Sequence, residues 1–265
     1  MEQYIINSGN EVDSIAVVHG KYYDKIHEKH VSAYGEFGAA NIRDNITSTF
    51  REALIQLNAP NKNNNMLLVG KVQSGKTSNL ELFTALAFDN GFNLVIIYGG
   101  YDSTLLSQTT NRFKKTFDIP NDTDYSDDTP VVFSSDDSAQ LLTVDDEIIE
   151  DLLDADKPIF LISMKRPAAM NKVNDLLARI DKSKLKAFII DDEGDQASLN
   201  TKKNKVLDAS ATYASIVSMK DHLSDPLYLS VTATPQALIL DQRNEANKLE
   251  GKKKKHKGMP DPAND

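Results

Sequence analysis

The sequence predicts an α/β fold in which a mostly parallel β-sheet is flanked by helices. Six short apolar segments alternate with segments of helical spacing along the 265 residues. Strands as apolar as these are usually buried on both faces, which is typical of parallel sheets between helix layers. A glycine-rich pattern between the first apolar segment and a helical one adds a strand, loop and helix unit.

The six predicted strands are short apolar runs with polar or turn-forming neighbours. They are MLLV (66–69), FNLVIIY (92–98), PVVF (130–133), PIFLIS (158–163), AFIID (187–191) and LYLSV (227–231). The spacing between strands is helical, because apolar side chains recur on one face. One example is the set Met170, Val173, Leu176, Leu177 and Ile180.

A helix is also predicted ahead of the first strand. It would open at Asp44 or Asn45 and end near Asn58, where a loop begins. Its apolar residues follow the spacing i, i+4, i+8 and i+11, and they are Ile46, Phe50, Leu54 and Leu57. Residues 1–35 show no clear period, and we interpret residues 1–38 as an N-terminal extension of a domain that covers residues 39–244.

Charge is distributed unevenly along the chain. The net charge is -9, yet residues 118–156 hold fourteen acidic and no basic residues, which leaves 30 basic against 25 acidic residues elsewhere. We interpret 118–156 as a solvated acidic insertion flanking one strand and one helix, the alternative being nucleic acid strand mimicry or a partner site. Residues 245–265 are rich in Lys, Pro, Gly and Asn, and we expect a disordered tail there.

Composition excludes several classes of site. The chain has no cysteine, which rules out disulfides and thiolate zinc sites and favours a reducing compartment. No apolar run approaches the roughly 18 to 20 residues that span a bilayer, and the first ten residues lack a signal-peptide pattern. We therefore expect a cytoplasmic protein with no membrane partner. His27 and His30 have metal-like spacing but no evident third ligand, so no zinc is expected.

The segment GKVQSGKT (70–77) fits the phosphate-binding pattern G-x-x-x-x-G-K-[ST]. A chance match is expected in only about 1% of chains of this length. Glycines let backbone N–H groups converge on phosphate oxygens, and the start of the following helix adds a favourable field. The predicted nucleotide contacts are Gly70, Gln73, Ser74, Gly75, Lys76, Thr77 and Ser78. Within this set, Lys76 would reach the outer phosphates of ATP and Thr77 would offer its hydroxyl to Mg²⁺.

An acidic run ends the fifth apolar segment, in KAFIIDDEGDQAS. Mg²⁺ needs an acidic contact besides phosphate, so we assign Asp192 to the metal and Glu193 to the attacking water. A strand that merely leaves the core into a polar turn is the alternative. After the sixth segment, TATP places Thr232 and Thr234 at the strand end. Its position after the carboxylate strand favours a functional motif, and a hydroxyl-rich turn stopped by proline is the alternative.

In this order the three motifs resemble the first RecA-like domain of superfamily two helicases, with a phosphate loop, a DExD box and a Ser/Thr-Ala-Thr motif. The resemblance covers roughly residues 40 to 240 and implies a RecA-like P-loop NTPase. It gives Asp192 the metal and Glu193 the water. It also implies that Asp195, Thr232 and Thr234 couple the nucleotide site to a nucleic acid site.

The chain resembles more narrowly the Z-one domain family of endonuclease-related bacterial and phage-associated proteins. The shared stretches are VQSGKTSN, IIDDEGDQASLN, SVTATPQA and GGYDSTLLSQTTNRF. The last of these suggests a DNA contact through Thr109 and Arg112, to which we add the nearby Lys115. A solvated helix face is the alternative for these three residues.

The expected function is Mg²⁺-dependent ATP binding by the first motor domain of a helicase-like, DNA-acting ATPase in a restriction or phage-defence setting. Such motors need an arginine finger from a second RecA-like domain or a partner subunit, so hydrolysis by this chain alone should be weak. Two alternatives remain open. One is a non-enzymatic, nucleotide-binding regulatory module, and the other is an endonuclease component whose nuclease site lies elsewhere.

Overall fold

The computed structural model describes residues 15–60, 64–69, 76–120, 128–135, 144–192 and 211–232. Six strands form one sheet in the order β1-β6-β5-β2-β4-β3, and every neighbouring pair is parallel. The strands are β1 (Asn65–Val69), β2 (Leu94–Tyr98), β3 (Val131–Ser134), β4 (Ile159–Ser163), β5 (Ala187–Asp192) and β6 (Leu227–Thr232). All six predicted strands are observed, and the predicted fold class is confirmed.

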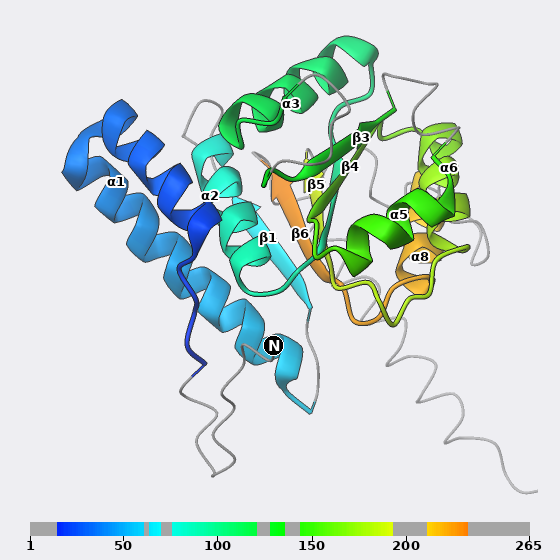
Figure 1. Cartoon of the computed structure of the whole chain (residues 1–265), viewed down its shortest axis with the longest axis horizontal. Coiled ribbons are helices and arrows are strands. Elements are labelled where there is room, and N and C mark those ends of the chain that lie inside the picture. The colour runs from blue at the N-terminus through cyan, green and yellow to red at the C-terminus, as the bar shows by residue number, and fades with distance from the viewer. Residues whose placement is uncertain are drawn as a thin grey trace, which may run out of the picture.

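Helices cover both faces of the sheet (Figure 1). One face carries α1 (Lys21–Asn58), α2 (Lys76–Asp89) and α3 (Ser103–Thr116), and the other carries α5 (Asp146–Asp154), α6 (Pro167–Leu177) and α8 (Ala211–Asp221). Each layer has its own apolar core, because successive strand residues point to opposite faces. Within the described residues, no helix has both the length and the apolar composition of a membrane crossing.

The N-terminal helix differs from the prediction. It begins at Lys21, not near Asp44, and its first half buries Tyr22, Tyr23 and Ile26 in the same core as α2. The buried side of that half contains aromatic and histidine residues, so the sequence shows no regular spacing of aliphatic residues there. Gly35 interrupts the helix with a φ of 71°, and two helical arms meet there (Figure 1).

The second arm of α1 follows the prediction. It buries Ile46, Phe50 and Leu54 and ends at Asn58. Because α1 is described as one element from Lys21 to Asn58, the domain boundary predicted between residues 38 and 39 falls inside it.

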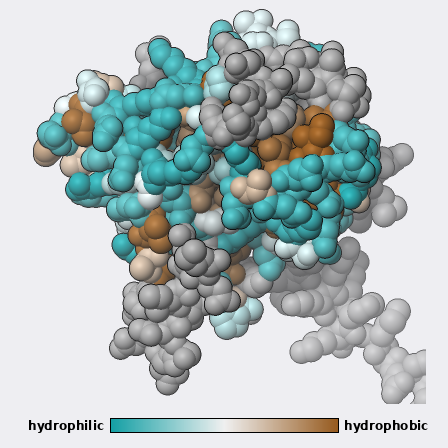
Figure 2. Space-filling model, in the orientation of Figure 1, coloured by the Kyte–Doolittle hydropathy of each residue, from teal (hydrophilic) through white to brown (hydrophobic). Residues whose placement is uncertain are grey.

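The acidic stretch 118–156 contains the expected strand and helix, β3 and α5. β3 is the edge strand next to β4, and α5 buries Ile149, Leu152 and Leu153. The surface over α1 and α5 is mainly hydrophilic (Figure 2), as expected for helices that bury one face. Residues 121–127 and 136–143, and the predicted tail 245–265, lie outside the described residues.

The end of α2 anchors the start of α1. The carboxylate of Asp89 accepts hydrogen bonds from the backbone N–H groups of Gly20 (3.0 Å), Tyr22 (3.2 Å) and Tyr23 (2.7 Å). Burial raises the pKa of Asp89, while these donors act in the opposite direction. Asn90 adds a reciprocal pair of 2.9 Å hydrogen bonds with the backbone of Val18.

Replacing Asp89 by Ala should therefore destabilise the fold. Three N–H groups at the start of α1 lose their acceptor, and we expect the free energy of unfolding to fall by about 1–3 kcal/mol. Urea denaturation measures this. Asp44→Ala is the matched control, since Asp44 lies on the exposed side of α1 beside Arg43 and should have little effect. Equal midpoints for the two variants would contradict the anchor.

A glycine shapes the turn after β2. Gly100 has a φ of 72°, and an added Cβ would lie 2.5 Å from the Cβ of Leu105. That atom is fixed to the backbone of α3 and cannot rotate away. Gly35 has nearly the same φ, yet nothing lies within 4 Å of its added Cβ.

The two glycines form a matched pair for mutation. Gly35 combines a φ of 71° with a ψ of 169°, a region that is almost restricted to glycine, so Gly35→Ala should cost about 1–3 kcal/mol of stability from backbone strain alone. Gly100→Ala should cost about 1–3 kcal/mol more, because the overlap with Leu105 comes on top of the strain. Denaturant midpoints of the two variants measure the difference. A Gly100→Ala protein as stable as Gly35→Ala would show that the close packing is not as described.

Candidate nucleotide-binding site

Three sequence motifs end at the same edge of the sheet. β6 lies between β1 and β5, and the register pairs Val69 with Thr232 and Val231 with Asp192. Paired residues of neighbouring strands lie about 5 Å apart. The strand before the phosphate loop, the strand with the acidic run and the strand with the threonine motif therefore reach one carboxyl edge together. Ligands of open α/β sheets usually bind outside this edge.

The helix after the phosphate loop starts at this edge. β1 ends at Val69 and α2 begins at Lys76, so a strand precedes residues 70–75 and a helix follows them, as predicted. The first four N–H groups of a helix have no partner within it, and together with the helix dipole they favour an anion. Thr77 is half-buried and Ser78 is buried in the first turn. Gly70, Gln73, Ser74, Gly75 and the side chain of Lys76 lie outside the described parts of the chain.

Asp192 lies on the same face of the sheet as α2. In β5, Phe188 and Ile190 belong to the core shared with α1 and α2. Side chains two residues apart in a strand lie on the same face, so the half-buried side chain of Asp192 is on the face of Phe188 and Ile190. The side chain of Asp191 is on the opposite face. The N-terminus of α2 and the Asp192 carboxylate thus lie on the same face and at the same edge of the sheet. β6 separates β1, which precedes α2, from β5, which carries Asp192.

These two positions fit a magnesium ion by the chemistry of their donors. Mg²⁺ prefers hard oxygen ligands and is often held by one or two carboxylates together with phosphate and water. The hydroxyl of Thr77 and the carboxylate of Asp192 are such donors. The described residues contain no group of three or more acidic or histidine side chains that could hold a metal alone, and Mg²⁺ with phosphate does not require one. Glu193 lies beyond the end of β5 and outside the described residues.

Only the first residue of the threonine motif lies within the described residues. Thr232 is buried at the end of β6. It shares the face of Tyr228, which belongs to the core under α6 and α8, so Thr232 and Asp192 point to opposite sides of the sheet. Thr234 and Asp195 lie outside the described residues. The coupling role of these residues stays a prediction.

A buried polar cluster lies beside Asp191. This side chain is fully buried, forms an ion pair with Lys165 and accepts a 2.7 Å hydrogen bond from the hydroxyl of Tyr228. Burial, followed by the negative charge of Asp191, raises the pKa of Tyr228, so the phenol stays protonated and donates. The sequence interpretation missed Lys165 and Tyr228. In the sequence, Lys165 stands out only by its position two residues after an apolar strand, and a lysine at such a position is normally exposed.

The kink of α1 reaches the first turn of α2. The hydroxyl of Tyr34, directly before Gly35, lies 2.6 Å from the hydroxyl of Ser78 and hydrogen-bonds to it. Ser78, predicted as a nucleotide contact, therefore also ties the kink of α1 to the helix after the phosphate loop. The sequence interpretation missed Tyr34 because it placed this region in an extension without regular structure.

The three DNA-contact candidates lie on α3 in different environments. Thr109 is half-buried and packs on Gly99, whose added Cβ would lie 3.1 Å from the Thr109 hydroxyl, whereas Arg112 and Lys115 are exposed. The C-terminal end of α3 packs beside the C-terminal end of α2, with 5.9 Å between the rings of Phe117 and Phe88. Arg112 and Lys115 thus lie on the exposed side of a helix that packs along α2, and their role as DNA contacts stays a prediction.

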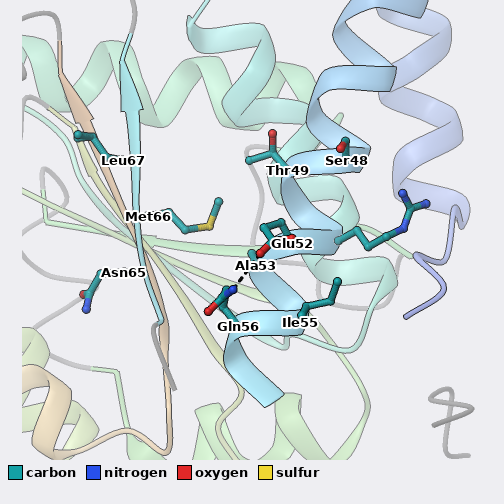
Figure 3. Close-up of a pocket in the computed structure, with 10 residues that line it drawn as sticks. Ser48, Thr49, Glu52, Ala53, Ile55, Gln56, Asn65, Met66 and Leu67 are labelled. Atoms are coloured by element: carbon teal, nitrogen blue, oxygen red, sulfur yellow. Dashed lines mark hydrogen bonds between the residues drawn. The ribbon is translucent and has the colours of Figure 1, made fainter. Parts of the chain in front are cut away.

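A separate groove of about 540 Å³ lies between α1 and β1 (Figure 3). Met66 points from β1 toward α1, whereas Asn65 and Leu67 point away from it. On the α1 side, the amide of Gln56 donates a 2.9 Å hydrogen bond to Glu52. The β1 residues that line this groove are the first three of the strand. The groove is therefore distinct from the carboxyl edge of the sheet, where the three motifs lie.

Comparison with known proteins adds a similarity to a solved structure. No protein-family model matches the chain, and no curated protein matches it. Among solved structures, the chain is similar to the crystal structure of the Pyrococcus furiosus Hef helicase domain, at 16% identity and a TM-score of 0.39. The match covers 64% of this chain and 30% of that one. A similarity this low does not assign a function, and the Z-one resemblance rests on the quoted motifs alone.

Proposed function

We propose that this chain binds ATP with Mg²⁺ at the carboxyl edge of β1, β6 and β5, as the first motor domain of a helicase-like ATPase that acts on DNA. The observation that carries the proposal is the register that pairs Val69 with Thr232 and Val231 with Asp192. The strands that carry these motifs are far apart in the sequence but end side by side in the sheet. Asp192, in the acidic motif, lies on the sheet face that α2 covers.

Each residue of the site has a chemical role in this proposal. The loop from Gly70 to Gly75 and the first turn of α2 bind the phosphates, and Lys76 neutralises the outer ones. Thr77 and Asp192 hold Mg²⁺, which supplies charge neutralisation on the phosphate oxygens when bound. Glu193 orients the attacking water and accepts its proton. An arginine finger comes from a second RecA-like domain or a partner subunit, so turnover by this chain alone is slow.

The nearest match to a guanine-reading pattern lies in an environment that does not suit base recognition. Guanine-specific proteins carry N-K-x-D in a loop, whereas Asn171, Lys172 and Asn174 lie within α6. Asn174 stands in the place of the acidic residue. It is buried and donates a 3.0 Å hydrogen bond to the backbone oxygen of Ser215. A side chain held in the core in this way is not free to read a base.

The biological setting is part of the proposal and rests on the sequence resemblance. A Z-one-like ATPase would act in restriction or phage defence, with any nuclease site in a partner or another domain. A regulatory module that binds nucleotide without turnover is the second candidate. The two differ in their response to DNA, because a motor domain couples nucleic acid binding to its nucleotide site and a regulatory module need not.

Nucleotide binding is tested by titrating a fluorescent ATP analogue with and without Mg²⁺. Lys76→Ala should weaken binding by roughly ten- to a hundredfold, since it removes a charge-assisted hydrogen bond. Glu193→Gln should keep binding and lose the remaining turnover. Lys182→Ala changes an exposed lysine in the turn before β5 and should bind like the wild type. Equal affinities for Lys76→Ala and Lys182→Ala would overturn the proposal.

The DNA contact is tested separately through α3. The double substitution Arg112→Ala, Lys115→Ala removes two exposed cations. The slope of the logarithm of the DNA association constant against the logarithm of the salt concentration should become about two units less steep. Arg179→Ala, Lys182→Ala removes two exposed cations near the end of α6, on the opposite side of the sheet, and is the charge-matched control. Equal slopes for the two variants would remove Arg112 and Lys115 from the DNA interface.

A further inference from the structure

A fully buried lysine lies next to the acidic end of β5. Lys165 follows the end of β4 by two residues and is only 1% exposed. Its ammonium group forms an ion pair with the carboxylate of Asp191 and donates a 3.2 Å hydrogen bond to the backbone oxygen of Asp192. The lysine therefore contacts both consecutive residues of the strand end that carries the candidate metal ligand.

The backbone around Lys165 is fixed by neighbouring loops. The N–H of Lys165 donates a 2.9 Å hydrogen bond to the oxygen of Gly100, and the N–H of Gly99 donates one of 3.1 Å to the oxygen of Ser163. The N–H of Met164 donates a 3.0 Å hydrogen bond to the hydroxyl of Ser135. Lys165 thus extends from a backbone that the turns after β2 and β3 hold in place.

Asp191 is held on its other side as well. One carboxylate oxygen pairs with Lys165 and the other accepts the 2.7 Å hydrogen bond from Tyr228. Tyr228 is in β6, the strand that separates β5 from β1. The cluster therefore connects β4, β5 and β6 at the carboxyl edge, on the face opposite Asp192.

Stability alone explains such a cluster poorly. A buried ion pair gains little over well-packed apolar residues, because both charges lose their hydration. The contact that an apolar side chain cannot reproduce is the one to the peptide oxygen of Asp192. That contact fixes the peptide plane at the residue whose carboxylate lies on the nucleotide face.

We propose that Lys165 is a positioning residue, which orients Asp192 for Mg²⁺ by holding its backbone oxygen and the neighbouring carboxylate of Asp191. This inference rests on the proposed function, because Lys165 can position a metal ligand only if Asp192 binds Mg²⁺. Lys165 itself touches neither nucleotide nor metal. Its loss should reduce the contribution of Mg²⁺ to binding and leave the phosphate loop unaffected.

The test compares nucleotide affinity with and without Mg²⁺ in an apolar replacement of the cluster. Lys165→Met, Asp191→Val, Tyr228→Phe removes both charges and the hydroxyl together, so no buried charge is left unpaired. The group that loses a donor is the backbone oxygen of Asp192, which is the contact under test. The single variant Lys165→Met is measured beside it, with the folded fraction of each taken from circular dichroism. Tyr228→Phe alone keeps both contacts of Lys165 and is the matched control.

We expect both Lys165 variants to bind the Mg²⁺-free analogue within about threefold of the wild type, and to lose at least about tenfold of the Mg²⁺-dependent increase in affinity. Tyr228→Phe should keep that increase. A folded Lys165 variant that keeps the full Mg²⁺ effect would overturn the positioning role and leave the proposed function standing. A wild-type protein that binds no nucleotide would instead overturn the proposed function, and the positioning role with it.

Discussion

The pairing of β6 between β1 and β5 is the constraint on which the rest of the structure depends. Parallel pairing places the carboxyl ends of all three strands at one edge. The register then determines which residues become neighbours, since a slip of one residue would move Asp192 to the other face of the sheet. Continuous apolar cores on both faces oppose such a slip, so the packing of the sheet is also what aligns the candidate site.

The helix layer over this sheet positions the first turn of α2. At its C-terminal end, α2 is tied to α1 through Asp89, and at its N-terminal end through the hydrogen bond between Tyr34 and Ser78. α1 folds back at Gly35, so its two arms pack along the same helix. The start of α2, where four N–H groups lack helix partners, is therefore supported from outside the sheet as well as by β1.

The sequence predicted the six strands because strands buried on both faces are continuous apolar runs, such as those that end at Tyr98 and Ser163. It missed the first arm of α1, whose buried face uses Tyr22, Tyr23 and His30 in place of aliphatic residues. It also missed Lys165, because burial of a lysine depends on a partner, here Asp191, that another strand supplies. Neighbours across strands follow from strand order, which no local pattern contains.

The central claim is that one ligand binds at the edge where three adjacent strands end. Hydrogen–deuterium exchange with and without a Mg²⁺-bound, non-hydrolysable ATP analogue measures this directly. Slower exchange is predicted together in three peptides, which cover residues 70–78, 190–195 and 230–235. Protection of the first peptide alone, or of none, would contradict a shared site at the carboxyl edge of β1, β6 and β5.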